Sequence, residues 1–325
     1  MMYNIESKLP MVSDKFSISM KRQRPDKEIS GSPERTDFRC VIESDDGGLF
    51  LIECFDLSKS KRKQIIAETI NRLNIHGLKK TIPYEKSLDG SFLFTESGLV
   101  WQICRFIESD NIVRPDYIFL PEIGAVFADF IIDLNRISRK IDLNSADLPF
   151  FSIKKYIVSI FSQINTHNPE IIPGIKPVYD FLKAEFFEKH CLLKEGFCHG
   201  DIHPMNAIWK NNEIIAVIDW EFMGIKPEIY DLANLLGCIG IEDPNALGGN
   251  LVNELIGKLK KSGIYGNESW DILIEFVIAV RFGWLSEWLR KKDTEMIHLE
   301  TDFMNLLLNY SKDIKSHWNT IRGEN

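Results

Sequence analysis

Three side chains in the stretch 198–221 have the types and the spacing for phosphoryl-transfer chemistry. Asn206 lies five residues after Asp201, and Asp219 ends a short apolar run, Ile214 to Ile218. A carboxylate can orient a hydroxyl group and accept its proton, whereas amide and carboxylate oxygens are the ligands that Mg²⁺ prefers. Transfer of a phosphoryl group to a hydroxyl needs both functions. Asp201 therefore suits the base, and Asn206 and Asp219 suit the metal ligands.

The residues between these side chains predict how they come together. The stretch "WKNNEIIAVID" has strand-like residues on either side of Asn211-Asn212, a pair that tolerates a tight turn. A hairpin at this point would return the chain and bring Asp219 beside Asn206. The strand is thus the return path that closes the metal site.

The same residues form part of a longer pattern. The segments "HGDIHPMNAI", "VIDWE" and "YDLANL" resemble the signature of the aminoglycoside phosphotransferase and choline-kinase-like enzymes, which are small-molecule relatives of protein kinases. The resemblance implies ATP as the phosphate donor, Asp201 as the catalytic base, and Asn206 and Asp219 as magnesium ligands. It also implies structural roles for His199 and for Asp231, which would tie the catalytic loop to the following helix. It extends over roughly residues 30–310.

The order of elements favours an α+β chain with a two-lobed, protein-kinase-like fold. Residues 1–30 are expected to form an irregular arm, because charged residues alternate with Pro10 and Pro25. Residues 31–108 predict a small antiparallel β lobe that binds nucleotide. Residues 109–325 predict a larger, mainly helical lobe that holds the catalytic loop, the metal site and the acceptor site.

The nucleotide side of the pattern departs from the family. Kinase-like enzymes place a lysine on the third strand, paired with a glutamate on the next helix. Here the strand "GLFLIECFD" has Glu53 at that position, and Glu68 is the expected helix partner. Arg39 on the preceding strand is the best substitute for the lysine. The neighbouring lysines at 59, 61 and 63 are interpreted as a solvated basic turn.

Other nucleotide contacts are expected from a loop and a connector. The loop "SGSPERTDFRC" contains a single glycine, but Ser32 could contact phosphate, as could Arg35 and Thr36. The segment "WQICRF" resembles the connector that hydrogen-bonds adenine through its backbone, with Gln102 to Cys104 as the contacts. An ordinary buried strand is an equally good interpretation of that segment.

Candidate acceptor-binding residues follow the motifs. Trp284 and Trp288 are four residues apart, so they share a helix face and could stack on a sugar or surround an ammonium group. Arg281 could hold an acceptor carboxylate, and Glu221 is a further candidate. The residues leave amino alcohols, amino acids, sugars and aminoglycosides open as acceptors, and ATP and GTP open as donors.

Composition excludes several function classes. The formal net charge of −8 argues against non-specific binding to nucleic acid or acidic lipid. No run is apolar enough for a membrane span and no signal-peptide pattern is present, so a cytoplasmic protein with scattered free cysteines is expected. His203 favours a loop-shaping hydrogen bond, since no third ligand near His199 and His203 would complete a zinc site.

Two alternatives to a small-molecule kinase remain. Because Glu53 replaces the lysine, one alternative is a pseudokinase or nucleotide-binding scaffold, although Asp201, Asn206 and Asp219 are all present. A protein kinase is disfavoured, because the segment from Asp219 to Asp231 is too short for an activation loop.

Overall fold

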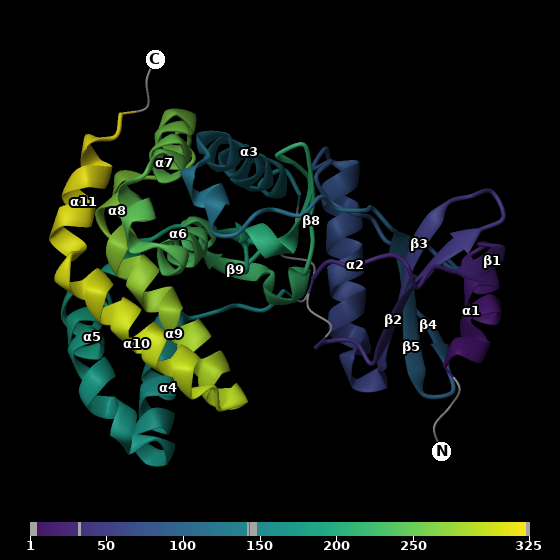
Figure 1. Cartoon of the computed structure of the whole chain (residues 1–325), viewed down its shortest axis with the longest axis horizontal. Coiled ribbons are helices and arrows are strands. Elements are labelled where there is room, and N and C mark those ends of the chain that lie inside the picture. The colour runs from purple at the N-terminus through teal and green to yellow at the C-terminus, as the bar shows by residue number, and fades with distance from the viewer. Residues whose placement is uncertain (1–4, 32–33, 142, 144–147, 323–325) are drawn as a thin grey trace. The chain divides into compact units, whose positions relative to one another are not determined.

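The computed structural model describes residues 5–31, 34–141, 143 and 148–322, and the chain divides into two compact units (Figure 1). The first unit comprises residues 1–111, 140–148 and 204–221, and the second comprises residues 112–139, 149–203 and 222–325. The first is built around a β-sheet and the second is mostly helical, as the sequence predicts. The proposed lobe boundary at residue 108 stays a prediction, because the chain returns to the first unit at 204–221.

A five-stranded antiparallel sheet forms the centre of the first unit. Its strands, in spatial order, are β1 (Met20–Gln23), β2 (Phe38–Ser44), β3 (Leu49–Asp56), β5 (Leu99–Arg105) and β4 (Phe94–Glu96). The unit also contains the hairpin of β7 (Ala207–Lys210) and β8 (Glu213–Val217). The strand pairs expected from the sequence are therefore present.

The alternation of side chains along β3 decides which residues face the pocket of this unit. Phe50, Ile52 and Cys54 belong to the core that includes helix α1 (Leu9–Lys15). Leu51 and Glu53 point to the other face, toward helix α2 (Ser60–Ile75). The two helices lie on opposite sides of the sheet (Figure 1). A period of two thus sends Glu53 into the pocket rather than into the core.

The structure differs from the irregular arm that the sequence predicts over residues 1–30. Residues 9–15 form α1, and residues 20–23 add strand β1 to the edge of the sheet. Leu9, Val12 and Phe16 are buried at helical spacing. Pro10 does not interrupt the helix, because a proline in the first turn gives up an amide that has no intrahelical partner.

The second unit contains nine helices among its described residues and one small strand pair. The helices are α3 (Pro121–Ser138), α4 (Ile153–His167), α5 (Ile172–Glu185), α6 (Tyr230–Glu242), α7 (Asn250–Ser262), α8 (Asn267–Asp271), α9 (Leu273–Lys291), α10 (Thr294–Asn309) and α11 (Ser311–Thr320). The strands β6 (Glu195–Cys198) and β9 (Gly224–Pro227) pair on either side of the catalytic loop in sequence. Helix α5 has Pro177 inside it.

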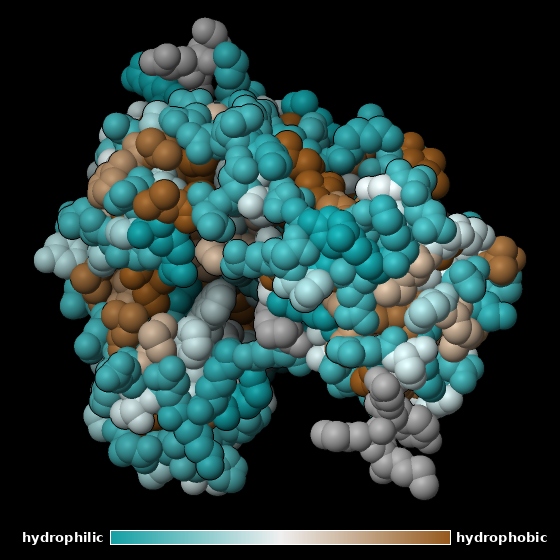
Figure 2. All heavy atoms as spheres, turned by 45° about the vertical axis from the view of Figure 1, so that its right-hand side comes forward, coloured by the Kyte–Doolittle hydropathy of each residue, from teal (hydrophilic) through white to brown (hydrophobic). Residues whose placement is uncertain are grey.

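Hydrophilic side chains dominate the face in Figure 2, and hydrophobic ones form small separate groups. Scattered apolar residues of this kind are normal on a protein surface. Within the part of the chain that the structure describes, no helix has both the length and the apolar character needed to cross a bilayer.

Candidate active site

The hairpin of β7 and β8 brings the two proposed metal ligands together. The amide of Ile218 donates a hydrogen bond to the carbonyl of Asn206 over 2.9 Å, directly beyond the paired residues Ala207 and Val217. Asn211 and Asn212 form the turn with φ angles of 50° and 62°. A two-residue turn with both φ positive matches the twist of a hairpin. Asn206 and Asp219 therefore flank the open end of one hairpin, opposite its turn.

Asp219 lies in the left-handed region with a φ of 60°, and its carboxylate already has a cationic partner. Arg35 Nη1 donates to Asp219 Oδ1 over 2.7 Å. Asn206 is 4% exposed. A buried amide and a carboxylate that attracts a cation form an oxygen donor set that suits a divalent metal ion.

The loop that carries the proposed base Asp201 is anchored by Asp231 at the start of α6. The amide of His199 donates to Asp231 Oδ2 over 2.8 Å, and the amide of Gly200 donates to Oδ1 over 2.7 Å. Gly200 has a φ of 87°, and a Cβ there would lie 2.3 Å from the carbonyl oxygen of Phe222. Only glycine fits, so the turn before Asp201 is fixed by the backbone.

Burial raises the pKa of the Asp231 carboxyl to about 6, although the two amide donors oppose this rise. A desolvated carboxylate is disfavoured, whereas hydrogen bonds to its charged form stabilise it. The ionised carboxylate accepts both loop amides at neutral pH. Directly after Asp201, the carbonyl of Ile202 accepts a hydrogen bond from Asn234 Nδ2 over 3.2 Å, which is a second contact between the loop and α6.

An aromatic row lies beside the proposed base within the second unit. His203 Nε2 is 3.8 Å from Asp201 Oδ2, and the His203 ring meets the Trp284 ring edge-on at 6.0 Å between centroids. Trp284 and Trp288 follow at 5.9 Å. The indole nitrogen of Trp288 is buried and has no hydrogen-bond partner among the described residues. The shared helix face predicted for the two tryptophans is present on α9.

Arg281 does not serve the role expected from its sequence position. It is 2% exposed and donates to both carboxylate oxygens of Glu300, which is fully buried, over 2.5 and 2.6 Å. A buried guanidinium that is already bidentate to a carboxylate cannot receive an acceptor carboxylate without leaving Glu300 unpaired. The pair links α9 to α10 and is structural.

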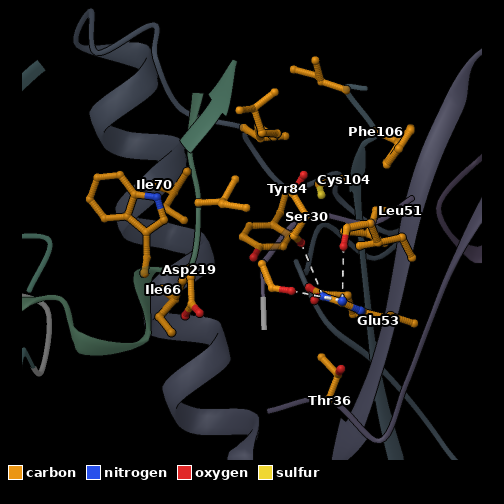
Figure 3. Close-up of a pocket in the computed structure, with 18 of the residues that line it drawn as sticks. Ser30, Thr36, Leu51, Glu53, Ile66, Ile70, Tyr84, Cys104, Phe106 and Asp219 are labelled. Carbon is orange, nitrogen blue, oxygen red and sulfur yellow. Dashed lines mark hydrogen bonds between the residues drawn. The ribbon is translucent and has the colours of Figure 1, made fainter. Parts of the chain in front are cut away.

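The pocket of the first unit combines an apolar wall and a charged wall (Figure 3). Its apolar part includes Leu51 on β3, Ile66 and Ile70 on α2, and Phe106 after β5. Its charged residues are Arg35, Arg39, Glu53, Lys63, Arg105, Asp219 and Glu221. An apolar slot that ends in charges suits a molecule with a flat ring at one end and a charged chain at the other.

Helix α2 presents Lys63, not Glu68, to this pocket. Lys63, Ile66 and Ile70 line the pocket at spacings of three and four residues, which is one helix face. Glu68 lies on an exposed face and accepts a hydrogen bond from Gln64 Nε2 over 2.5 Å. The expected pairing of Glu68 with the third strand is therefore wrong, and so is the solvated interpretation of Lys63, which is 7% exposed.

Lys63 is held by the segment that follows Asp219. Its ammonium forms an ion pair with Glu221 Oε1 and lies 5.3 Å from the centroid of the Phe55 ring. Arg62 Nη2 donates to the carbonyl of Glu221 over 2.5 Å. Glu221, expected to contact the acceptor, thus belongs to the pocket of the first unit.

Arg39 and Glu53 lie opposite each other on paired strands, and each has a neighbour that engages it. The Arg39 guanidinium donates to the carbonyls of residues 29, 30 and 31 over 3.3, 3.4 and 3.1 Å. Burial lowers the pKa of this guanidinium, while the charges of Glu53 and Asp219 oppose that shift. Gln102 Nε2 donates to Glu53 Oε2 over 2.6 Å. Arg39 therefore supports the loop before β2.

The connector begins later than the sequence suggests. Gln102 is 1% exposed and faces Glu53 from inside β5, so it does not line the pocket. Cys104 lines the pocket, and Arg105, Phe106 and Ile107 continue that wall. Strand β5 extends to Arg105, so the residues 102–104 expected to form the connector belong to the strand. Ser32 lies outside the described residues.

The sequence of this chain matches the model of a known protein family. The model of the phosphotransferase enzyme family matches residues 66–259, more than half of the chain. The chain belongs to the phosphotransferase enzyme family. The family match runs from α2 to α7, so it includes the hairpin, the catalytic loop and Asp231. With this family, the chain is a small-molecule phosphotransferase, as the motifs predict. No curated protein sequence matches the chain.

Solved structures of the family share the fold over nearly the whole chain. A microcompartment-associated aminopropanol kinase superposes with a TM-score of 0.72 at 12% identity, covering 98% of this chain and 100% of that one. An amicoumacin kinase in complex with AMP-PNP, Ca²⁺ and Ami gives 0.69 at 13% identity, covering 99% and 96%. A GDP complex of aminoglycoside 2′-phosphotransferase-IIIa gives 0.64 at 15%, covering 97% and 99%. The two-lobed, protein-kinase-like fold is thereby confirmed for this member of the phosphotransferase family.

Proposed function

We propose that this phosphotransferase moves the γ-phosphate of ATP to a hydroxyl group of a small, polar, aminated metabolite. The observation that carries the proposal is the hairpin end, where the Ile218 amide donates to the Asn206 carbonyl over 2.9 Å. It holds an amide side chain and a carboxylate at neighbouring positions, as a metal ion bound to a nucleotide requires.

Asn206 and Asp219 would hold the metal ion, for which we propose Mg²⁺. In the part of the chain described here, no cluster of three or more histidine, cysteine, aspartate or glutamate residues forms a metal cage. Mg²⁺ in phosphoryl-transfer sites needs only one or two protein ligands besides phosphate and water oxygens. When bound, the ion would neutralise charge on the phosphates. The guanidinium of Arg35 at Asp219 supports a preference of this carboxylate for positive charge.

Asp201 would act on the acceptor. Its carboxylate would accept a hydrogen bond from the acceptor hydroxyl and then its proton, as the oxygen attacks the γ-phosphorus. Gly200 and Asp231 would keep this carboxylate in place, because they fix the turn on which it sits. His203, near Asp201 Oδ2, would limit the positions of the side chain.

The nucleotide would bind in the pocket of the first unit, which supports residues 31–108 as the nucleotide-binding part of the chain. Leu51, Ile66, Ile70 and Phe106 offer an apolar surface for a base. The connector contacts would come from residues 104–107 rather than from Gln102. Two of the similar structures are named as complexes with AMP-PNP and with GDP, so both ATP and GTP belong in the test.

The acceptor would carry an amine. Trp284 and Trp288 offer aromatic faces that attract ammonium groups, and the buried indole N–H of Trp288 could donate to a hydroxyl. Arg281 is committed to Glu300, which disfavours a carboxylate-bearing acceptor. Among similar structures, one is named an aminopropanol kinase and another a gentamicin complex. Amino alcohols and amino sugars are therefore the first acceptors to screen.

A thermal-shift measurement tests the nucleotide site without knowledge of the acceptor. Mg²⁺-ATP and Mg²⁺-GTP should raise the melting temperature of the wild type in a saturable way, since a ligand that binds only the folded state stabilises it. Asp219→Asn should lose the metal-dependent part of the shift. ADP release with a panel of amino alcohols and amino sugars then identifies the acceptor, with Asp201→Asn as the blank. No shift at millimolar nucleotide would favour the scaffold alternative raised by Glu53.

A further inference from the structure

Four cationic side chains line the pocket within the described residues, and three of them hold parts of the protein itself. Arg35 is paired with Asp219, and Arg39 donates to the three carbonyls of residues 29–31. The guanidinium of Arg105 lies 4.3 Å from the ring centroid of Phe50, which belongs to the core on the other face of the sheet. The fourth cation is Lys63.

Lys63 differs from the other three in what its partner leaves available. A lysine ammonium has three donors, and the ion pair with Glu221 Oε1 uses one of them. The side chain is 7% exposed and lines the pocket from helix α2, on the same face as Ile66 and Ile70. A cation with spare donors on a poorly hydrated wall binds an anion strongly, because little water competes for it.

The usual charges of a kinase-like pocket are exchanged in this chain. Kinase-like enzymes have a lysine on the third strand and a glutamate on the helix. Here the strand carries Glu53 and the helix carries Lys63, and both line one pocket. Glu53 is compensated by the Gln102 amide at 2.6 Å and by the charge of Arg39. The positive charge is therefore still present, on the helix instead of the strand.

We propose that Lys63 binds the α- and β-phosphates of the nucleotide donor, and that Glu221 positions its ammonium as the helix glutamate positions the strand lysine in the usual arrangement. The inference rests on the proposed function, since it requires a nucleoside triphosphate in the pocket. The phosphate-binding residue would then lie on helix α2 and not on the third strand.

The test compares ligands with and without phosphates. Dissociation constants for ATP, ADP and adenosine are measured by calorimetry, in the presence of Mg²⁺, on the full-length chain. Lys63→Ala should weaken ATP and ADP about 10- to 100-fold, the range for loss of one charge-assisted hydrogen bond, and leave adenosine unchanged. The matched control is Lys61→Ala, which removes the same charge from an exposed position of the same helix and should change none of the three constants.

Each possible result decides a different point. ATP and ADP constants within twofold of the wild type in Lys63→Ala would overturn the inference, and so would an equal loss for adenosine, which would mean that Lys63 only supports the pocket. If the wild type binds neither ATP nor GTP, the proposed function fails and this inference fails with it. Should Lys63→Ala unfold because Glu221 loses its partner, Lys63→Ala/Glu221→Ala removes both charges and permits the same comparison.

Discussion

The hairpin and the loop before Asp201 have the residues that the family resemblance predicts, whereas the pocket of the first unit has Glu53 on the strand and Lys63 on the helix. Asn206 and Asp219 flank the open end of the hairpin, and Asp231 accepts hydrogen bonds from the loop amides before Asp201. In the pocket, strand β3 contributes the carboxylate of Glu53 and helix α2 contributes the ammonium of Lys63. The loop depends on fixed backbone geometry. If Lys63 binds phosphate as proposed, the pocket would need only a positive charge near that phosphate, which more than one element can supply.

The largest expected effect tests the loop that carries Asp201. Asp201→Asn should lower kcat by about 10²- to 10⁴-fold, the range for loss of a general base, and leave the dissociation constant of Mg²⁺-ATP unchanged. Steady-state kinetics with an accepted amino alcohol or amino sugar measure the first quantity, and calorimetry measures the second. Asp302→Asn, an exposed carboxylate on α10, is the matched control and should behave as the wild type. Retention of more than a tenth of the activity in Asp201→Asn would remove Asp201 from the mechanism.

An intermediate effect is expected for the anchor of the loop. Asp231→Asn keeps one acceptor oxygen and places an NH₂ group against a loop amide, because the wild-type carboxylate accepts from both His199 and Gly200. Leaving one buried donor without an acceptor costs about 1–3 kcal/mol in the free energy of unfolding at pH 7. Urea denaturation measures this loss.

The same variant has a pH signature. The pKa of Asp231 in the folded protein, about 6, lies above the ordinary aspartate value of 3.8, so the folded state binds the proton more tightly than the unfolded state. The contribution of this carboxyl to stability is therefore fully present below pH 3.8, falls as the pH rises toward 6 and is constant above it. The difference in unfolding free energy between the wild type and Asp231→Asn should decline from pH 4 to 6 and then level off. A difference that is flat over this range would mean that Asp231 ionises as in water.

The contrast between the two regions also explains what could be predicted from the sequence. The turn at Asn211-Asn212 and the position of Asp219 after an apolar strand could be predicted, because each depends on neighbouring residues. The alternation along β3 likewise sends Glu53 to the pocket face. These signals are confined to a few neighbouring residues.

The position of Lys63 in the pocket depends on how helix α2 is rotated about its axis relative to the sheet, which the local sequence does not specify. Three lysines at alternate positions look like a solvated turn, yet one of them lies on the face shared by Ile66 and Ile70. The commitment of Arg281 to Glu300 joins residues 19 positions apart on different helices. Helix α1 is not predicted because Pro10 indicates a break in the chain, although Leu9, Val12 and Phe16 have helical spacing.

The smallest expected effect distinguishes the two cations that could serve the phosphates. Arg39→Ala removes three hydrogen bonds to the carbonyls of residues 29–31, whose atoms line the pocket. Because these bonds position a loop and do not depend on the ligand, the affinities for ATP, ADP and adenosine should all fall by a similar factor, about threefold to tenfold. Arg22→Ala, an exposed arginine on β1 that is paired with Glu43, is the matched control and should leave all three constants unchanged.

The ratio of the dissociation constants for ATP and adenosine distinguishes Arg39 from Lys63 as the residue that binds phosphate. Under the exchange of charges proposed here, that ratio changes in Lys63→Ala and stays constant in Arg39→Ala. If Arg39→Ala instead weakens ATP and ADP far more than adenosine, the phosphates bind at β2 beside Glu53, and the pocket has kept its cation on the sheet. A variant with both substitutions then tests independence: two cations on separate phosphates should give losses that multiply, whereas a loop support and a phosphate ligand should couple through the same bound chain.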